Sequence, residues 1–177
     1  MGKKNYLIDG VSGAGKTTIG TELQKRGYHV IHGDRELKYR GNRETGERVL
    51  PNTDHPSAEW LSEHQLWDLD LVHSHIANRN EEITFFCGGS RNYSKFVDLL
   101  DGVFILDIDR ETMMMRIHER VAVDPTDFGA TQEERNLILR LHDTKEDIPN
   151  NGEVIDATQA VDRVVGNILE SIRNKNS

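Results

Sequence analysis

The stretch that decides the fold is Gly10-Val11-Ser12-Gly13-Ala14-Gly15-Lys16-Thr17, which matches G-x-x-x-x-G-K-[ST] at every position. An apolar run at residues 5–9 precedes it, and a helical pattern begins near Lys16. In such a setting the glycines turn backbone N–H groups around phosphate oxygens, and the start of the helix adds the positive end of its dipole. Lys16 is expected to reach the β- and γ-phosphates, and the Thr17 hydroxyl to bind Mg²⁺.

This stretch, called the phosphate loop from here on, therefore predicts nucleotide binding. A plain glycine-rich turn is the alternative, but such a turn seldom has both an apolar strand before it and a helix after it. The residues expected to contact the nucleotide here are Gly10, Ser12, Gly13, Ala14, Gly15, Lys16, Thr17 and Thr18.

Around the phosphate loop, short apolar runs alternate with helical patterns. Strands are expected at residues 5–9, 28–32, 83–87, 103–108 and 154–156, and helices from 16 and at 56–80, 110–121, 132–145 and 158–173. Strands that alternate with helices imply a parallel sheet covered on both faces. A single domain over residues 1–177 is expected, with residues 34–55 lacking clear periodicity and residues 122–131 forming a loop.

The composition argues against several classes of protein. The 177 residues include 22 Lys and Arg against 30 Asp and Glu, a net charge of −8, so binding of nucleic acid or of a membrane surface is not expected. The single Cys87 excludes an intrachain disulfide. Neither a signal peptide nor an apolar run of ~20 residues is evident. We expect a cytoplasmic monomer or homodimer whose partner is a small-molecule acceptor.

The order of these elements resembles that of the small P-loop kinases, the group of gluconate kinase, shikimate kinase and adenylate kinase. The resemblance covers nearly the whole chain, although the motifs outside the phosphate loop are individually weak. It implies the three-layer α/β/α P-loop NTPase fold, with a five-stranded parallel sheet in the order 2-3-1-4-5. It also implies ATP and Mg²⁺ as cofactors and an acceptor-binding region at residues 34–80, after the second strand.

Asp34 follows the second expected strand, where kinases similar to gluconate and shikimate kinase carry an Asp that contacts the acceptor hydroxyl. A carboxylate beside the γ-phosphate can orient the hydroxyl or accept its proton. The alternative is a cap for the helix that follows. Residues 34–48 hold five basic and four acidic side chains, which fits either an anionic acceptor, with Arg35 as a ligand, or a solvated surface.

After the third expected strand, the segment Cys87-Gly88-Gly89-Ser90-Arg91 resembles the corresponding part of gluconate kinases. Gly88 and Gly89 would let an acceptor approach the backbone closely, and Arg91 would hold the acceptor or its phosphate.

Adenylate kinases have an Asp in the Mg²⁺ shell at the position of Cys87, and a buried thiol is expected there instead. A Mg²⁺ ion would then depend on Thr17, Asp34, phosphates and water.

Arg116 and Arg120 lie four residues apart, on one face of an expected helix. They resemble the R-x-x-x-R of adenylate kinases, in which the first Arg stacks on adenine and the second contacts phosphates. A pair of solvated charges is the alternative. Residues 122–131 would form a short lid, with Arg135 or Arg140 as weak candidates for reaching the γ-phosphate.

The sequence therefore predicts an ATP-dependent kinase that moves the γ-phosphate onto a hydroxyl of a small metabolite, which can be anionic. Lys16, Asp34 and Arg120 are the expected catalytic residues. A nucleoside or nucleotide kinase is the nearest alternative, because Arg91, Arg116 and Arg120 would serve it equally well. An ATP-binding regulatory module without phosphotransfer is the alternative from another class. The acceptor itself does not follow from the sequence.

Overall fold

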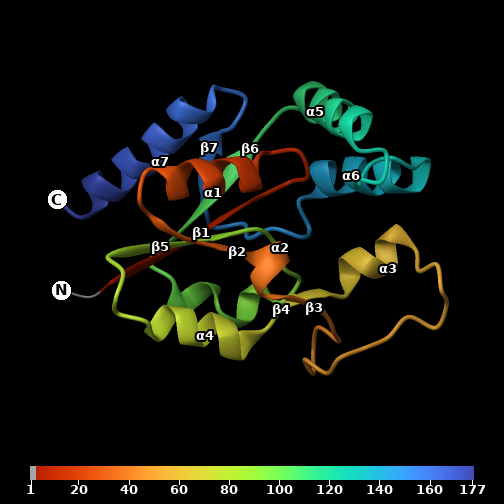
Figure 1. Cartoon of the computed structure of the whole chain (residues 1–177), viewed down its shortest axis with the longest axis horizontal. Helices are drawn as coiled ribbons and strands as arrows, with labels where there is room; N and C mark the ends of the chain where they lie inside the picture. Colours follow the sequence, from red (N-terminus) through yellow and green to blue (C-terminus); the bar gives the residue numbers. More distant parts are fainter. Residues whose placement is uncertain (1–2) are drawn as a thin grey trace.

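A parallel sheet of five strands forms the centre of the computed structural model, which describes residues 3–177 (Figure 1). The first two residues, part of the segment in which no signal peptide was expected, lie outside the described residues. The strands are β1 (Lys4–Gly10), β2 (His29–His32), β5 (Ile83–Cys87), β6 (Gly102–Asp107) and β7 (Glu153–Asp156). Their order is β2-β5-β1-β6-β7, which is 2-3-1-4-5 when only these five are counted along the chain. The expected α/β fold with a five-stranded parallel sheet is confirmed.

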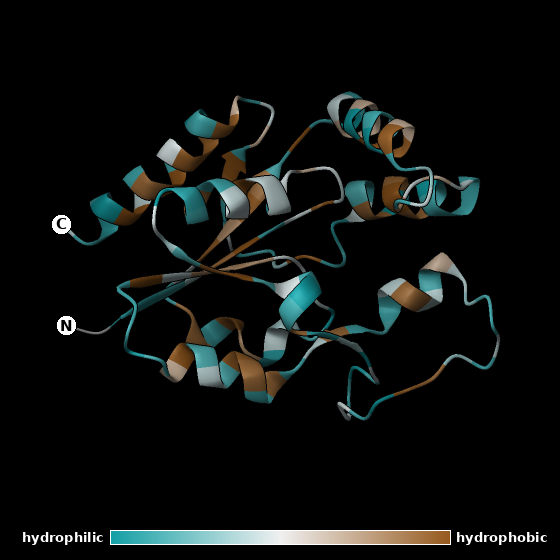
Figure 2. Ribbon diagram, viewed as in Figure 1, coloured by the Kyte–Doolittle hydropathy of each residue, from teal (hydrophilic) through white to brown (hydrophobic). Residues whose placement is uncertain are grey.

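Helices cover both faces of the sheet. One face carries α1 (Lys16–Lys25) and α7 (Val161–Lys175), and the other carries α4 (Leu69–Ala77) with two short 3-10 turns, η1 (Tyr93–Lys95) and η2 (Val97–Leu99) (Figure 1). Near the carboxyl ends of the strands lie α5 (Arg110–Val123) and α6 (Gln132–Thr144). The strands are mostly apolar and the helices alternate between apolar and polar residues (Figure 2). This pattern is typical of a sheet buried between two helical layers.

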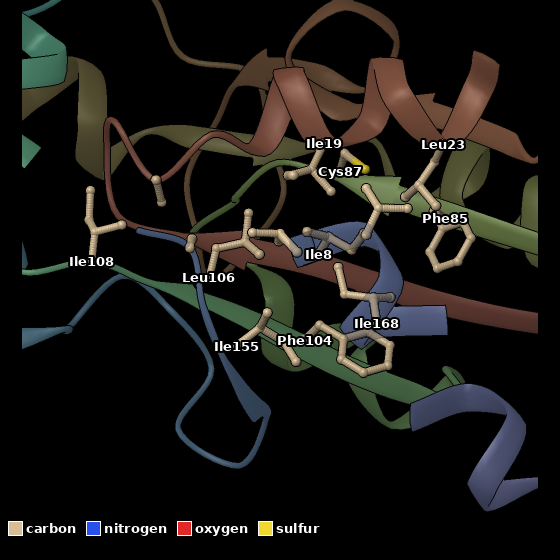
Figure 3. Close-up of a cluster of buried hydrophobic side chains, with 14 of the residues drawn as sticks. Ile8, Ile19, Leu23, Phe85, Cys87, Phe104, Leu106, Ile108, Ile155 and Ile168 are labelled. Carbon is tan, nitrogen blue, oxygen red and sulfur yellow. The ribbon is translucent and has the colours of Figure 1, made fainter. Parts of the chain in front are cut away.

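Alternate side chains along the strands belong to two separate hydrophobic clusters, one on each face of the sheet. Ile8 and Cys87 belong to the cluster on the side of α1 and α7, where they pack with Leu23 and Ile168 (Figure 3). Leu7, the neighbour of Ile8, belongs to the cluster on the side of α4. Because successive side chains of a strand point to opposite faces, this division fixes the direction of every other side chain along β1.

The prediction of a single helix over residues 56–80 is wrong. The structure has α3 (Ala58–Glu63), β4 (Gln65–Trp67) and α4 in that stretch. Ser57 caps α3 and Asp68 caps α4, so two helices start where one was expected. Between them, Trp67 is fully buried. Its backbone N–H donates to the side-chain oxygen of Asn92, and the side-chain amide of Asn92 donates to its backbone carbonyl. Burial of this indole outweighs the helical periodicity of the surrounding residues.

Residues 34–55 contain a strand that was not expected. They begin within α2 (Gly33–Glu36) and continue into β3 (Lys38–Arg40), which pairs antiparallel with β4. A single bridge joins Gly41 to Arg48 in the loop that follows. The two-stranded sheet of β3 and β4 follows α2, which begins at the carboxyl end of β2. It therefore lies at the same end of the central sheet as the phosphate loop.

None of the helices within residues 3–177 combines the length and the apolar character that crossing a membrane requires.

Candidate nucleotide and acceptor site

A cavity of about 1080 Å³ opens at the carboxyl end of the sheet. The phosphate loop forms one part of its wall, and the segments that follow β2 and β5 form another. We call these parts the nucleotide end and the acceptor end. The residues expected to bind nucleotide or acceptor that line the cavity are Gly10, Ser12, Gly13, Ala14, Gly15, Lys16, Thr17, Thr18, Asp34, Gly89, Arg91, Arg116 and Arg120.

The backbone of the phosphate loop has the conformation that its glycines permit. Gly13 and Gly15 adopt φ angles of 80° and 98°, in the left-handed region that disfavours other residues. Gly15 directly precedes α1, so the first N–H groups of this helix face the cavity wall. Lys16 donates to the carbonyls of Gly10 and Val11, and it pairs with no carboxylate of the described chain. Its charge is therefore available to a phosphate.

Two arginines of α5 border the nucleotide end. Arg116 donates to the carbonyl of Ala157 at 2.8 Å and to that of Gly13 at 3.3 Å, which places it between the phosphate loop and the loop after β7. Arg120 forms an ion pair with Asp127 at 3.2 Å and also donates to the carbonyl of Phe128. Arg120 is thereby tied to the loop at residues 122–131, and both guanidinium groups line the cavity.

The other two arginines considered at the sequence level lie outside the cavity lining. Arg135 donates to the carbonyls of Gly129 and Ala130 and so closes the turn before α6. Arg140 pairs with Glu59 at 2.9 Å and with Glu146 at 3.2 Å, which joins α6 to α3. Their side chains make these contacts instead of reaching toward the phosphate loop.

Asp34 lies in the first turn of α2 and lines the acceptor end. It does not cap this helix: the N-cap residue is His32, and its N–H donates to Glu36 at 2.6 Å. The amide of Gln65 approaches the Asp34 carboxylate at 3.5 Å and donates to the carbonyl of Gly89 at 3.0 Å. Asp34 is exposed, so its carboxylate remains open to a ligand.

The basic residues of the acceptor end differ in part from those expected. Arg35 and Gly88 do not line the cavity, whereas Lys38 and Arg40 do. Lys38 and Arg40 are alternate residues of β3 and share one of its faces, a relation that stayed hidden because β3 was not predicted. Arg40 forms no ion pair among the described residues, and burial lowers its pKa.

Arg91 is held firmly at the acceptor end. Its guanidinium donates to the carbonyl of Ser62 at 3.2 Å and to the Ser62 hydroxyl at 2.8 Å. The backbone N–H of Arg91 donates to the backbone carbonyl of Gln65. The segment after β5 is therefore bonded to both α3 and β4. Arg91 can still offer its remaining N–H groups to an anion, because a guanidinium has five donors.

One acidic residue that lines the cavity was not considered in the sequence analysis. Asp9 ends the apolar run of β1 and is only 1% exposed. Its Oδ1 atom accepts from the N–H of Gly10 at 2.7 Å, while Oδ2 has no hydrogen-bond partner within residues 3–177. Burial raises the pKa of Asp9 to about 7, against the opposing effect of Lys16. A lone acidic residue inside an apolar strand, directly before the phosphate loop, was the available signal.

Cys87 is buried, as expected, and its side chain belongs to the hydrophobic cluster on the side of α1 and α7. Burial raises the pKa of its thiol to about 12, so the sulfur stays neutral near pH 7. A neutral thiol is a poor ligand for Mg²⁺, which prefers oxygen. The position that a carboxylate occupies in adenylate kinases therefore supplies no charge to this cavity.

Among the comparisons with known proteins, the comparison with solved structures found similar proteins. No protein-family model matches the sequence, and no curated protein gives a significant match. The gluconokinase from Sinorhizobium meliloti 1021 is 17% identical over 98% of each chain, with a TM-score of 0.54. A sugar kinase from Janibacter sp. HTCC2649 is 20% identical over 95% of this chain and 93% of its own, with a TM-score of 0.53. The Thermus thermophilus protein TT1252 is 15% identical over 100% of both chains, with a TM-score of 0.58.

The chain thus has the fold of small P-loop kinases, and the resemblance seen in the sequence is confirmed at this level. At such low identity the likeness concerns the fold, and the chemistry must be argued from the cavity itself.

Proposed function

We propose that this protein is a kinase that transfers the γ-phosphate of ATP to a hydroxyl group of a small molecule. The observation that carries the proposal is a single cavity that joins the phosphate loop to the exposed carboxylate of Asp34 and to Arg40. Phosphoryl transfer requires a nucleotide and an acceptor side by side, with little covalent chemistry from the protein. The kinase names of two structural neighbours agree with this assignment.

At the nucleotide end, the N–H groups of the phosphate loop and Lys16 would bind the phosphates. Arg116 lies where it can stack on the base, between Gly13 and Ala157, because a guanidinium plane stacks well on aromatic rings. Arg120 would approach the phosphates once its ion pair with Asp127 opens. Closure of residues 122–131 over the nucleotide would exclude water and limit hydrolysis of ATP.

Thr17 and Asp34 are the residues that would hold Mg²⁺. Both line the cavity and both offer oxygen, the ligand atom that this ion prefers. No group of three or more metal-binding side chains occurs in the described part of the chain, which fits an ion held mainly by phosphates and water. When bound, Mg²⁺ neutralises charge on the phosphates.

At the acceptor end, Asp34 would orient the hydroxyl toward the γ-phosphate or take up its proton. Arg40 and Arg91 would bind an anionic group of the acceptor, with Lys38 adding positive charge. Their charges favour an acceptor that carries a carboxylate or a phosphate in addition to its hydroxyl.

A nucleoside or nucleotide kinase is the second candidate. The observation in its favour is the same pair of guanidinium groups, Arg40 and Arg91, which would suit the phosphate of a nucleotide acceptor. A phosphate acceptor needs no general base, so activity that survives loss of Asp34 would favour this candidate. A regulatory module without phosphotransfer would bind ATP and release no phosphorylated product.

A screen of acceptors tests the proposal. The protein would be incubated with ATP and Mg²⁺ and with nucleosides, nucleotides, sugar acids and other hydroxylated metabolites, and products would be identified by mass. We expect one acceptor class to gain a phosphate group, and Lys16→Ala to abolish the product. Asp34→Ala should strongly reduce it, while Arg35→Ala, a charge change outside the cavity, should not. Tight ATP binding without any phosphorylated acceptor would refute the proposal.

A further inference from the structure

A second cavity, of about 370 Å³, lies beside the acceptor end and shares Arg91 with the main cavity. We call it the outer pocket. Its volume lies within the range of about 300–1,000 Å³ that is typical of small-molecule sites. The lining comes from the turn after β3, from η1 and from the loop after α6. Most of its residues offer hydrogen-bond donors, namely Arg43, Arg91, Tyr93, Ser94 and Lys95.

The turn that carries Arg43 has a defined conformation and is bonded to η1. The side-chain oxygen of Asn42 accepts from the backbone N–H groups of Glu44 and Thr45, at 2.9 and 3.1 Å. The ammonium group of Lys95 in η1 donates to the backbone carbonyl of Glu44 at 2.9 Å. The two segments that carry Arg43 and Lys95 are therefore joined, and both side chains border one pocket.

The basic side chains of the outer pocket retain their positive charge for a ligand. Arg43, Arg91 and Lys95 form no ion pair in the part of the chain that the structure describes. Two carboxylates complete the lining, but Glu146 already forms an ion pair of 3.2 Å with an arginine of α6, which leaves Glu44 against three cations. In a chain with a net charge of −8, this local excess of positive charge indicates an anionic ligand.

Hydrogen-bond donors also remain in the outer pocket. Lys95 uses one of its three N–H groups on the carbonyl of Glu44, and Arg91 uses two of its five on Ser62. A phosphate monoester carries up to two charges and three strong acceptor oxygens. It therefore suits several guanidinium and ammonium groups around one pocket better than a single carboxylate does.

We infer that the outer pocket binds a phosphate group of the acceptor through Arg43, Arg91 and Lys95. The inference rests on the proposed function and narrows it, because it makes the acceptor a phosphate monoester that also has a hydroxyl group. Arg91 borders both cavities, so one molecule can place its hydroxyl at Asp34 and its phosphate in the outer pocket.

This phosphate differs from one that receives the γ-phosphate of ATP. Arg43 and Lys95 do not line the main cavity, and neither Lys16 nor Asp34 lines the outer pocket. A phosphate bound by Arg43 and Lys95 therefore lies apart from the phosphate loop, and it serves in binding rather than in transfer. Binding of such a remote group can orient the reacting hydroxyl.

Phosphate binding tests the outer pocket without any activity. The full chain would be saturated with a non-hydrolysable ATP analogue and Mg²⁺, which block the phosphate loop, and then titrated with inorganic phosphate in a calorimeter. We expect Arg43→Ala and Lys95→Ala each to weaken phosphate binding about 3–10-fold, and Arg43→Lys to restore part of the affinity. Added salt should weaken binding to the wild type. Arg35→Ala, a charge change outside both cavities, should have no effect.

Kinetics test whether this phosphate belongs to the acceptor. Acceptors from the screen would be compared in pairs that differ only by a phosphate group remote from the reacting hydroxyl. We expect the phosphorylated member to have a kcat/KM about tenfold higher or more, mainly through a lower KM. The double variant of Arg43→Ala and Lys95→Ala should lose this preference and should leave the reaction of the unphosphorylated member nearly unchanged.

The outcomes separate the failures. Phosphate affinity that is the same in the wild type, Arg43→Ala and Lys95→Ala, or no phosphate binding at all, would overturn the inference, while phosphorylation of an acceptor would still uphold the proposed function. Binding through these residues without a preference for the phosphorylated acceptors would overturn the link to the acceptor and indicate a site for free phosphate. A protein that binds phosphate here but phosphorylates nothing would refute the proposed function, and the link to an acceptor with it.

Discussion

At the nucleotide end of the cavity, one continuous run of residues from the end of β1 into α1 supplies the phosphate loop, whereas three separate segments build the acceptor end. Those segments are residues 34–40, 58–65 and 89–91. The first end depends on local backbone conformation and the second on tertiary contacts, such as the bond from the Arg91 N–H to the Gln65 carbonyl. A nucleotide site of this kind can be kept while the acceptor changes, because its structure does not depend on the other segments.

The largest effect is expected at the nucleotide end. Lys16→Ala should lower phosphoryl transfer about 10²–10³-fold or more for every acceptor, because it removes a charge aimed at the transferring group. Turnover assays with several acceptors would measure this. Loss of activity with one acceptor and retention with another would contradict the division between a common nucleotide end and a variable acceptor end.

The boundary between the two ends is marked by Asp9, and its burial should reduce stability at neutral pH. The folded state holds its pKa near 7, against an ordinary value of 3.8, so folding favours the protonated acid. Relative stability is therefore full below about pH 4 and is lost as the pH rises to about 7. Asp9→Asn should be more stable than the wild type by about 4 kcal/mol at pH 8 and by much less at pH 4.5.

Urea unfolding at the two pH values measures this difference, and Asp107→Asn controls for the loss of one charge. An advantage of Asp9→Asn that is equal at both pH values would show that the buried carboxyl does not titrate as described.

At the acceptor end, Arg40→Ala should raise the KM for an anionic acceptor about 10–100-fold, the equivalent of one lost charged hydrogen bond. The KM for ATP should not change, because Arg40 comes from β3 and lies apart from the phosphate loop. Arg35→Ala is the matched control, since Arg35 lies in the same segment but does not line the cavity. Equal effects of the two variants would contradict the placement of the acceptor.

The smallest effect is expected outside the cavity lining, at the ion pairs of Arg140. Arg140→Ala should lower stability by about 0.5 kcal/mol, because ion pairs between exposed side chains contribute little. The comparison variant Glu59→Gln should have a similar effect, and the double variant should add little to it. A loss of several kcal/mol in Arg140→Ala would mean that α3 and α6 depend on this contact far more than its exposure suggests.

The nucleotide end was predictable because its signal is contiguous. The phosphate loop, its strand and its helix all follow from neighbouring residues, and the same holds for the α/β alternation of the whole chain. Arg116 and Arg120 were found through their helical spacing, and the structure places both at the cavity.

The acceptor end was less predictable because its determinants are distant in sequence. The strands β3 and β4 have three residues each, too few for an alternating pattern to stand out. Trp67 fitted the apolar face of a helix, yet Asn92, far along the chain, holds it in a strand. Without β3 there was no reason to prefer Arg40 over Arg35.

Asp9 was missed for another reason. Its sequence position marks it as part of a buried strand, but only the structure reveals that Oδ2 lacks a donor within residues 3–177 and that the residue lines the cavity. Whether a buried carboxylate oxygen finds a donor depends on tertiary contacts, and these have no sequence pattern.

A crystal structure of the protein with a non-hydrolysable ATP analogue, Mg²⁺ and the acceptor identified in the screen would test the central claim most directly. The account predicts that the analogue lies on the phosphate loop and that the acceptor hydroxyl contacts Asp34, in line with the γ-phosphate. An acceptor bound elsewhere, or a hydroxyl directed away from the Asp34 carboxylate, would contradict it.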